Sequence, residues 1–147
     1  MDLVLDRGVT LTLPDFDGCR GWDAADEYIL NQEIIGKKIL VIGDKYGALT
    51  SGIEGEIHSY TNSVLCEQSI NNTLELNGKT GNVVHELSDL PNNVDIVVLK
   101  LPKSMDLLEY YLLLLAEKYK GTKLIIGGMV KYMPITMVRL VESYCLN

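Results

Sequence analysis

Small and charged residues follow the apolar segment Ile39–Ile42, where an α/β protein would bind a ligand. Gly43 and Gly47 are four residues apart, and Asp44 and Lys45 lie between them. Glycines in such a turn let the backbone approach a nucleotide. Lys45 stands where a nucleotide-binding turn has its middle glycine, and its side chain would crowd the ligand. The turn therefore indicates either an ordinary strand-to-helix connection or half of a cofactor loop.

A second polar turn, Thr61-Asn62-Ser63, follows the weaker apolar segment that begins at Ile57. In an adenosyl-binding site, a carboxylate here would accept hydrogen bonds from both ribose hydroxyls. Asn62 can form such bonds, but it carries no charge. Asn62 and Ser63 can equally well cap the helix that follows, so this turn leaves both interpretations open.

Two lysines flank Leu101-Pro102, at the end of a third apolar segment. Lys100 and Lys103 would place two cations beside the cleft of an α/β sheet. Ser104 then opens a helix, and a helix N-terminus favours anions. The pattern indicates either contact with phosphate or an RNA backbone, or two solvated lysines.

Other reactive residue types are scattered. His58 and His85 have no acid or second histidine at ligand spacing, so we expect no metal site and no general base. The three cysteines at positions 19, 66 and 145 are an odd number without a CxxC pair. They predict free thiols in a reducing compartment and no zinc site.

The elements that must position these residues alternate between strand and helix. Apolar runs predict strands at 37–44, 57–61, 83–87, 94–101 and 123–128, and helices at 22–33, 63–76, 104–118 and 135–144, with a short helix after Gly47. The alternation predicts an α/β fold with a doubly wound, mostly parallel sheet in a Rossmann-like or flavodoxin-like order. In helix 104–118 we expect one buried stripe, which consists of Leu107, Leu108, Tyr111, Leu112 and Leu115.

Length and charge limit the function further. The 147 residues suffice for one domain, and the net charge is −7. Residues 1–73 carry 12 acidic and 5 basic side chains, whereas residues 74–147 carry 8 of each. The acidic balance argues against a general nucleic-acid coat but permits a local basic face. We see no signal peptide and no run of ~20 apolar residues, so we expect a cytoplasmic protein without membrane contact.

Two segments carry a resemblance to a known family. Trp22-Asp23-Ala24-Ala25-Asp26-Glu27-Tyr28 and Leu99-Lys100-Leu101-Pro102-Lys103-Ser104 resemble the N-terminal domain of bacterial rRNA guanine-N2 methyltransferases of the RsmC/RlmG type. The similarity runs from about Trp22 to the C-terminus and also includes the turn 43–49 and the segment 71–78. It implies a class I S-adenosylmethionine-dependent methyltransferase fold, which here would lack its last strand pair. Residues 1–21 then form an N-terminal arm or hairpin, and 22–147 a degenerate methyltransferase-like domain.

The resemblance also implies what this copy does not do. In that family, the C-terminal copy binds S-adenosylmethionine and performs the chemistry, and the N-terminal copy supports folding and RNA recognition. Val41 replaces the acid of the first motif, Lys45 its second glycine, and Lys100-Leu101-Pro102-Lys103 the catalytic Asn-Pro-Pro-aromatic motif. Lys100 has donors only, so it cannot hold the amine that is methylated, and it would repel the sulfonium of the cofactor.

Three functions therefore remain. The first is a non-catalytic domain that partners a C-terminal catalytic domain and ribosomal RNA, with a vestigial pocket at Gly43, Asp44, Gly47, Asn62 and Lys100 and without catalytic residues, cofactor or metal of its own. Its RNA-binding candidates are Lys100, Lys103, Lys131 and Arg139. The second is an active, atypical methyltransferase in which Gly43, Asp44 and Gly47 hold the cofactor. The third is an interaction module that pairs with itself or a partner through an open sheet edge and helix 104–118.

Overall fold

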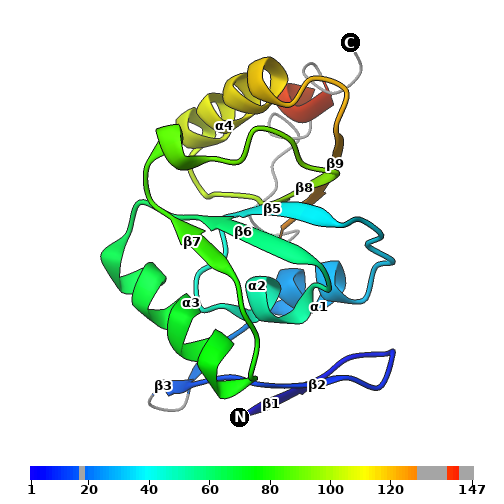
Figure 1. Ribbon diagram of the computed structural model, residues 1–147, viewed down its shortest axis with the longest axis vertical. Coiled ribbons are helices and arrows are strands. Elements are labelled where there is room, and N and C mark those ends of the chain that lie inside the picture. Colours follow the sequence, from blue (N-terminus) through cyan, green and yellow to red (C-terminus); the bar gives the residue numbers. More distant parts are fainter. Residues whose placement is uncertain (17–18, 129–138, 143–147) are drawn as a thin grey trace.

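The computed structural model describes residues 1–16, 19–128 and 139–142, and a five-stranded parallel sheet lies at its centre (Figure 1). The strands are β5 (Lys38–Ile42), β6 (Glu56–Tyr60), β7 (Asn82–Val84), β8 (Ile96–Lys100) and β9 (Lys123–Gly127). Their order is β7-β6-β5-β8-β9, and each neighbouring pair is parallel. This order confirms the α/β prediction and selects the Rossmann-like alternative. The order reverses between β5 and β8, so their carboxyl ends flank the place where such sheets bind ligands.

Helices cover both faces of the sheet. The helices α1 (Ala24–Leu30), α2 (Ala48–Gly52) and α3 (Val64–Leu76) lie on one face, and α4 (Met105–Lys118) lies on the other (Figure 1). Two predicted N-caps are confirmed, because Ser63 Oγ accepts the amide of Cys66 and Ser104 Oγ accepts the amide of Leu107. The helices α3 and α4 therefore begin directly after the strand ends at which the sequence predicted the site.

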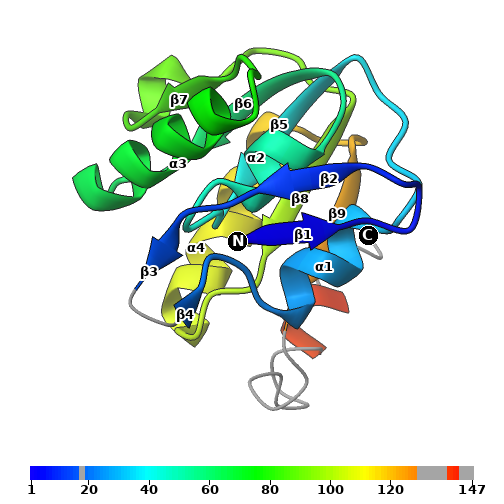
Figure 2. The same ribbon diagram turned by 90° about the horizontal axis from the view of Figure 1, so that it is seen from below.

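An N-terminal hairpin packs beneath the helices on the α1–α3 face (Figure 2). The strands β1 (Asp2–Val4) and β2 (Thr10–Thr12) pair antiparallel, and a short pair, β3 (Asp15–Phe16) and β4 (Cys19–Arg20), follows. Arg7 in the hairpin turn donates hydrogen bonds to the carbonyl oxygens of Leu30 and Gly52. Each carbonyl lies at the end of a helix, where the helix dipole favours a cation.

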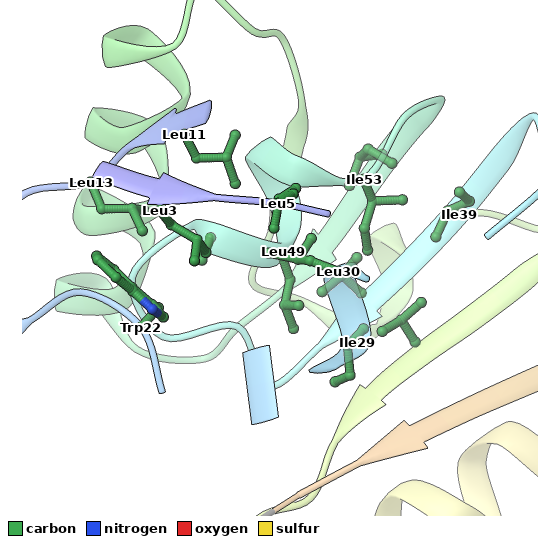
Figure 3. Close-up of a cluster of buried hydrophobic side chains, with 14 of the residues drawn as sticks. Leu3, Leu5, Leu11, Leu13, Trp22, Ile29, Leu30, Ile39, Leu49 and Ile53 are labelled. Atoms are coloured by element: carbon green, nitrogen blue, oxygen red, sulfur yellow. The ribbon is translucent and has the colours of Figure 1, made fainter. Parts of the chain in front are cut away.

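Two apolar clusters, one on each face of the sheet, form the core. The cluster on the α1–α3 face includes the alternating leucines of the hairpin, Trp22 of the following loop, and side chains from α1, α2 and β5 (Figure 3). The other cluster joins β5, β6 and β8 to the buried side of α4. Full burial of each large apolar side chain contributes roughly 1.5–3 kcal/mol to the free energy of unfolding. The hairpin is thus part of the main core, since its leucines fill the space below α2.

Three predictions about the elements are wrong in detail. Strand β7 ends at Val84, and a 3₁₀ turn (Leu87–Asp89) occupies the end of the predicted strand 83–87. Helix α1 is shorter than the predicted helix 22–33. Asp23 caps its start, and its last residue is Leu30. Leu107 is 38% exposed, so it does not belong to the buried stripe of α4. The part of the predicted helix 135–144 that is described, 139–142, is helical.

Candidate functional site

A cleft of about 580 Å³ opens at the carboxyl ends of β5, β6 and β8. Residues after these three strands line it, together with the beginnings of α3 and α4 and with the segment that enters α1. This is the edge at which the sheet order reverses, so the cleft lies where the fold class binds its ligands. Of the five predicted pocket residues, Gly43, Asp44, Asn62 and Lys100 line this cleft.

Asp44 holds the turn after β5 in shape. Its carboxylate is buried and accepts hydrogen bonds from the Gly47 amide (3.1 Å), the Thr50 amide (2.8 Å) and the Thr50 hydroxyl (2.5 Å). These bonds tie the turn to the first turn of α2. Because its oxygens are engaged inside the turn, Asp44 contributes negative charge to the cleft but has few acceptor positions left for a ligand.

The two glycines of this turn serve different contacts. Gly43 has a φ of +93°, and a Cβ at this position would lie 2.7 Å from the carbonyl oxygen of Lys100. The ends of β5 and β8 therefore approach each other as closely as a glycine allows. Gly47 is not among the residues that line the cleft. A Cβ there would meet Thr73 of α3 at 2.7 Å, so this glycine serves the packing of the turn on α3.

A partly buried ion cluster of Lys100, Asp23 and Asp26 occupies the cleft beside Gly43. Lys100 Nζ lies 2.9 Å from Asp23 Oδ2 and 3.0 Å from Asp26 Oδ1, and the side chain of Lys100 is only 16% exposed. The two acids lie at the start of α1. Asp26 precedes Lys100 by 74 residues in the chain. The two segments that carry the family resemblance therefore meet in this cluster.

Backbone amides fix the two carboxylates of the cluster. The Asp26 amide donates to Asp23 Oδ1 and the Asp23 amide donates to Asp26 Oδ2, each at 3.0 Å, which is a reciprocal capping box at the start of α1. The spacing of three residues is what this arrangement requires, so the sequence held a signal for it. Nothing in the sequence, however, indicated that Lys100 would complete the cluster.

Burial and pairing shift the pKa values within the cluster in different directions. Burial raises the pKa of Asp26 to about 6, although the Lys100 ammonium pulls it down. Burial also opposes ionisation of Asp23, but the Asp26 amide and Lys100 outweigh it and lower the Asp23 pKa. For Lys100, the two carboxylates outweigh burial and raise the pKa. At neutral pH, the cluster thus holds one cation between two carboxylates.

This geometry corrects the electrostatic role expected of Lys100. From the sequence alone, Lys100 is expected to be a cation that repels a sulfonium. In the structure, Asp23 and Asp26 more than balance the charge of Lys100, and the charge of Asp44 further raises the Asp26 pKa. Repulsion by Lys100 is therefore not the reason that a cationic cofactor would be disfavoured. The side chain instead occupies the space between the carboxylates.

The residues at this edge differ from those that the family resemblance predicts for a methyltransferase cofactor site. The turn after β6 reads Thr61-Asn62-Ser63, and Thr61 Oγ1 accepts the Ser63 amide (3.1 Å) within the turn itself. No carboxylate stands there to bind a ribose diol. Lys45 and Lys100 line the cleft at the positions where the family resemblance predicts a glycine and a catalytic asparagine in an active enzyme.

The remaining RNA-binding candidates lie in different places. Lys103 is exposed and lines the cleft, whereas Arg139 is exposed but is not among its lining residues. Lys131 lies outside the described residues. The ammonium of Lys100 is engaged by two carboxylates, which compete with any phosphate.

The histidines are less isolated than the sequence suggested. His58 Nε2 lies 3.1 Å from Glu56 Oε2, and His85 Nδ1 lies 3.7 Å from Glu67 Oε2. Within the described ranges, no three His, Cys, Asp or Glu residues form a group that could hold a metal ion. No helix in the described part of the chain is long and apolar enough to cross a bilayer.

Solved structures support the fold assignment. A Thermus thermophilus 16S rRNA N2 G1207 methyltransferase in complex with AdoMet and guanosine matches with a TM-score of 0.67 and 19% identity. The match covers 98% of this chain and 44% of that one. A precorrin-6y C5,15-methyltransferase from Geobacter metallireducens matches with a TM-score of 0.68 and 14% identity, over 90% of this chain and 76% of that one. The chain thus has the fold of S-adenosylmethionine-dependent methyltransferases.

Sequence comparison gives the family. The ribosomal RNA large subunit methyltransferase G of Streptomyces coelicolor is 34% identical over 136 residues, which is 86% of this chain and 36% of the relative. The corresponding methyltransferase of Pectobacterium atrosepticum is 34% identical over 117 residues, which is 74% of this chain and 31% of the relative. The chain therefore spans about a third of the length of these relatives. The model of the RLMG N-terminal domain matches residues 12–147. With this match over a Rossmann-like sheet, the chain belongs to the RLMG N-terminal domain family.

Proposed function

We propose that this chain is the non-catalytic N-terminal domain of a ribosomal RNA methyltransferase, acting in the cytoplasm. It supports the folding of a catalytic copy that binds S-adenosylmethionine, and it contributes to recognition of the rRNA substrate. Its relatives are named as rRNA methyltransferases, and this chain spans about a third of them. We assign methyl transfer to the part of those relatives that this chain does not cover.

The ion cluster is the observation that carries this proposal. Methylation of an exocyclic amine needs an acceptor at the end of β8, where Lys100 offers only donors. Asp23 and Asp26 hold the Lys100 ammonium at 2.9 and 3.0 Å, so this side chain is fixed in an arrangement unsuited to the reaction. Asp44, which the alternative of an active enzyme requires as a cofactor ligand, is engaged by Gly47 and Thr50.

Exposed apolar side chains support the interaction part of the proposal. On α4, the apolar side chains of Leu107, Tyr110 and Leu113 are 38–46% exposed and recur every three residues, and Leu107 also lines the cleft. In the described part of the sheet, β9 is an edge strand. A catalytic copy, or a second copy of this chain, could cover such surfaces.

Two measurements test the proposal. With labelled S-adenosylmethionine and rRNA, the 147-residue chain alone is expected to transfer no methyl group; labelled rRNA would establish the atypical enzyme instead. Lys103→Glu and Arg139→Glu are expected to weaken rRNA binding and to reduce the slope of log affinity against log salt by about 0.9 per lost phosphate contact. Unchanged binding in both variants would place the RNA surface elsewhere, outside the cleft and helix 139–142.

A further inference from the structure

Helix α1 is too short to hold its own position. It has seven residues, and an isolated helix of fewer than about 12 residues is marginal in water. Its middle packs on β9, where Ile29 lies against Gly127. Its start supplies Asp23 and Asp26 to the ion cluster, whereas Lys100 comes from β8, which lies between β5 and β9. The cluster therefore joins a central strand to a helix that other segments must hold in place.

The turn of the N-terminal hairpin binds the end of α1. The Arg7 guanidinium donates to the carbonyl oxygens of Leu30 (2.9 Å) and Gly52, the last residues of α1 and α2. The Asp6 amide donates to Oδ1 of Asn31 at 2.9 Å, and Asn31 is the C-cap of α1. Terminal carbonyls of a helix lack partners within the helix, so a guanidinium both satisfies them and matches the helix dipole.

The hairpin also packs beside the start of α1. Trp22 directly precedes the N-cap Asp23 and is 9% exposed. It belongs to the same apolar cluster as Leu3 of β1 and Leu13, which follows β2 (Figure 3). Because Trp22 and Asp23 are consecutive, a shift of these leucines would displace the backbone that carries the first acid of the ion cluster. The hairpin therefore supports α1 near both of its ends.

A separate attachment joins the hairpin to α3. Asn77, the C-cap of α3, pairs with the backbone of Thr12 in both directions. The Thr12 amide donates to Asn77 Oδ1, and Asn77 Nδ2 donates to the Thr12 carbonyl oxygen, each at 2.8 Å. These bonds lie at the opposite end of β2 from the turn that carries Arg7. The attachments to α1 and to α3 can thus be broken one at a time.

We propose that the N-terminal hairpin fixes α1 against the sheet and thereby keeps Lys100 bound between Asp23 and Asp26. With the hairpin in place, the Lys100 side chain is only 16% exposed. Release of the hairpin turn from α1 loosens the two acids, and the Lys100 ammonium then becomes accessible from the cleft. The proposal rests on the contacts between the hairpin and α1. It is independent of the RNA and folding roles proposed above, and either can fail without the other.

Amide hydrogen exchange and reductive methylation of the 147-residue chain, both followed by mass spectrometry, test the proposal. Arg7→Met removes both bonds of the guanidinium and retains an unbranched side chain. We expect exchange of the α1 amides and methylation of Lys100 by formaldehyde and borane to accelerate about tenfold or more, because a hydrogen bond to a charged group is lost. The amides of β5, which exchange through global unfolding, should accelerate less.

Asn77→Ala is the matched control, because it breaks the bonds between the hairpin and α3 and leaves Arg7 and Asp6 in place. Its effect on the α1 amides and on methylation of Lys100 should stay below about twofold. Three outcomes overturn the proposal: no acceleration in Arg7→Met, an equal acceleration in Asn77→Ala, or an equal acceleration of the β5 amides, which would indicate general destabilisation.

A milder substitution keeps the test decisive if Arg7→Met does not fold. Asn31→Ala removes the single bond from the Asp6 amide, and it should accelerate the same two reactions about threefold. Rates equal to those of the parent chain overturn the proposal. In the parent chain, Lys100 should also be methylated more slowly than the exposed Lys45. Equal rates would show that the ammonium is not held in the cluster, and the proposal would fail.

Discussion

Replacing Lys100 by Met removes the ammonium from the ion cluster and retains an unbranched side chain of similar length. Asp23 and Asp26 then remain without their cation. The pKa of Asp26 is about 6 with Lys100 present. At pH 7, its protonated form therefore lies only about 1 kcal/mol above its ionised form. Because Asp26 can take up a proton, this difference limits how much stability the fold loses at Asp26 when Lys100 is removed.

The limit sets both the size and the pH dependence of the effect. At pH 7, Asp26 contributes about 1 kcal/mol, and Asp23, whose side chain is 40% exposed, adds less than about 1 kcal/mol. We expect Lys100→Met to lower the free energy of unfolding by about 1–2 kcal/mol. Breaking a buried pair that cannot take up a proton would cost about 3–5 kcal/mol. At pH 5, where Asp26 is already protonated, the loss should fall below about 1 kcal/mol, and at pH 8 it should exceed the loss at pH 7.

Urea unfolding at pH 5, 6, 7 and 8 measures this difference. Trp22 is the only tryptophan of the chain, is 9% exposed and precedes Asp23, so its fluorescence reports on this region. Lys45→Met, which removes an exposed lysine of the same cleft, should change stability by less than about 1 kcal/mol at every pH. A loss in Lys100→Met that stays constant between pH 5 and 8, or is larger at pH 5, would refute the reasoning.

Three further substitutions test the site and the core. Because the Asp26 pKa is raised above that of the unfolded chain, the folded state binds the additional proton, and stability falls as pH rises from about 4 to 6. Urea unfolding should therefore show that the free energy of unfolding falls between pH 5 and 7 by about 1 kcal/mol less in Asp26→Asn than in the parent chain. Gly43→Ala forces a Cβ to 2.7 Å from the Lys100 carbonyl oxygen at a φ of +93°, and it should cost about 2 kcal/mol or more. Leu11→Ala removes a hairpin side chain that is 1% exposed, and it should cost about 2–5 kcal/mol.

Each of these results has a matched control. An identical pH slope in the parent and in Asp26→Asn would mean that Asp26 is not the titrating group. Gly8→Ala has a similar φ of +84° but no atom within 4 Å of the new Cβ, so it isolates backbone strain from the contact at Gly43. Val4→Ala, on the exposed side of the same hairpin at 63% exposure, should change stability by less than about 0.5 kcal/mol. Equal losses at Leu11 and Val4 would contradict the packing of the hairpin.

Local signals predicted the architecture because they depend on neighbouring residues. Continuous apolar runs indicated the buried strands β5 and β8, and the handedness of crossovers limited the strand order to two. Ser63 and Ser104 mark the starts of α3 and α4 through bonds that span three residues. Gly43, Asp44, Asn62 and Lys100 line one cleft because strand ends of a parallel sheet share one edge, whereas Gly47 does not line it.

The ion cluster could not be predicted because its partners are distant in sequence. Asp23 and Asp26 signalled a helix start, but their second function depends on where β8 ends in space. Without that contact, Lys100 looked like a cation facing solvent or a ligand. Leu107 was misplaced because the helical period fixes a stripe but not its width, and the apolar residues of α4 extend beyond the face that the sheet covers.

Calorimetric titration of the 147-residue chain with S-adenosylmethionine tests the central claim most directly. That claim is that a methyltransferase fold has lost its cofactor site, with Lys100 held between Asp23 and Asp26 at the end of β8. We predict no saturable heat of binding at cofactor concentrations up to about 1 mM. Binding with a Kd in the micromolar range would contradict the account and restore the cleft as a working cofactor site.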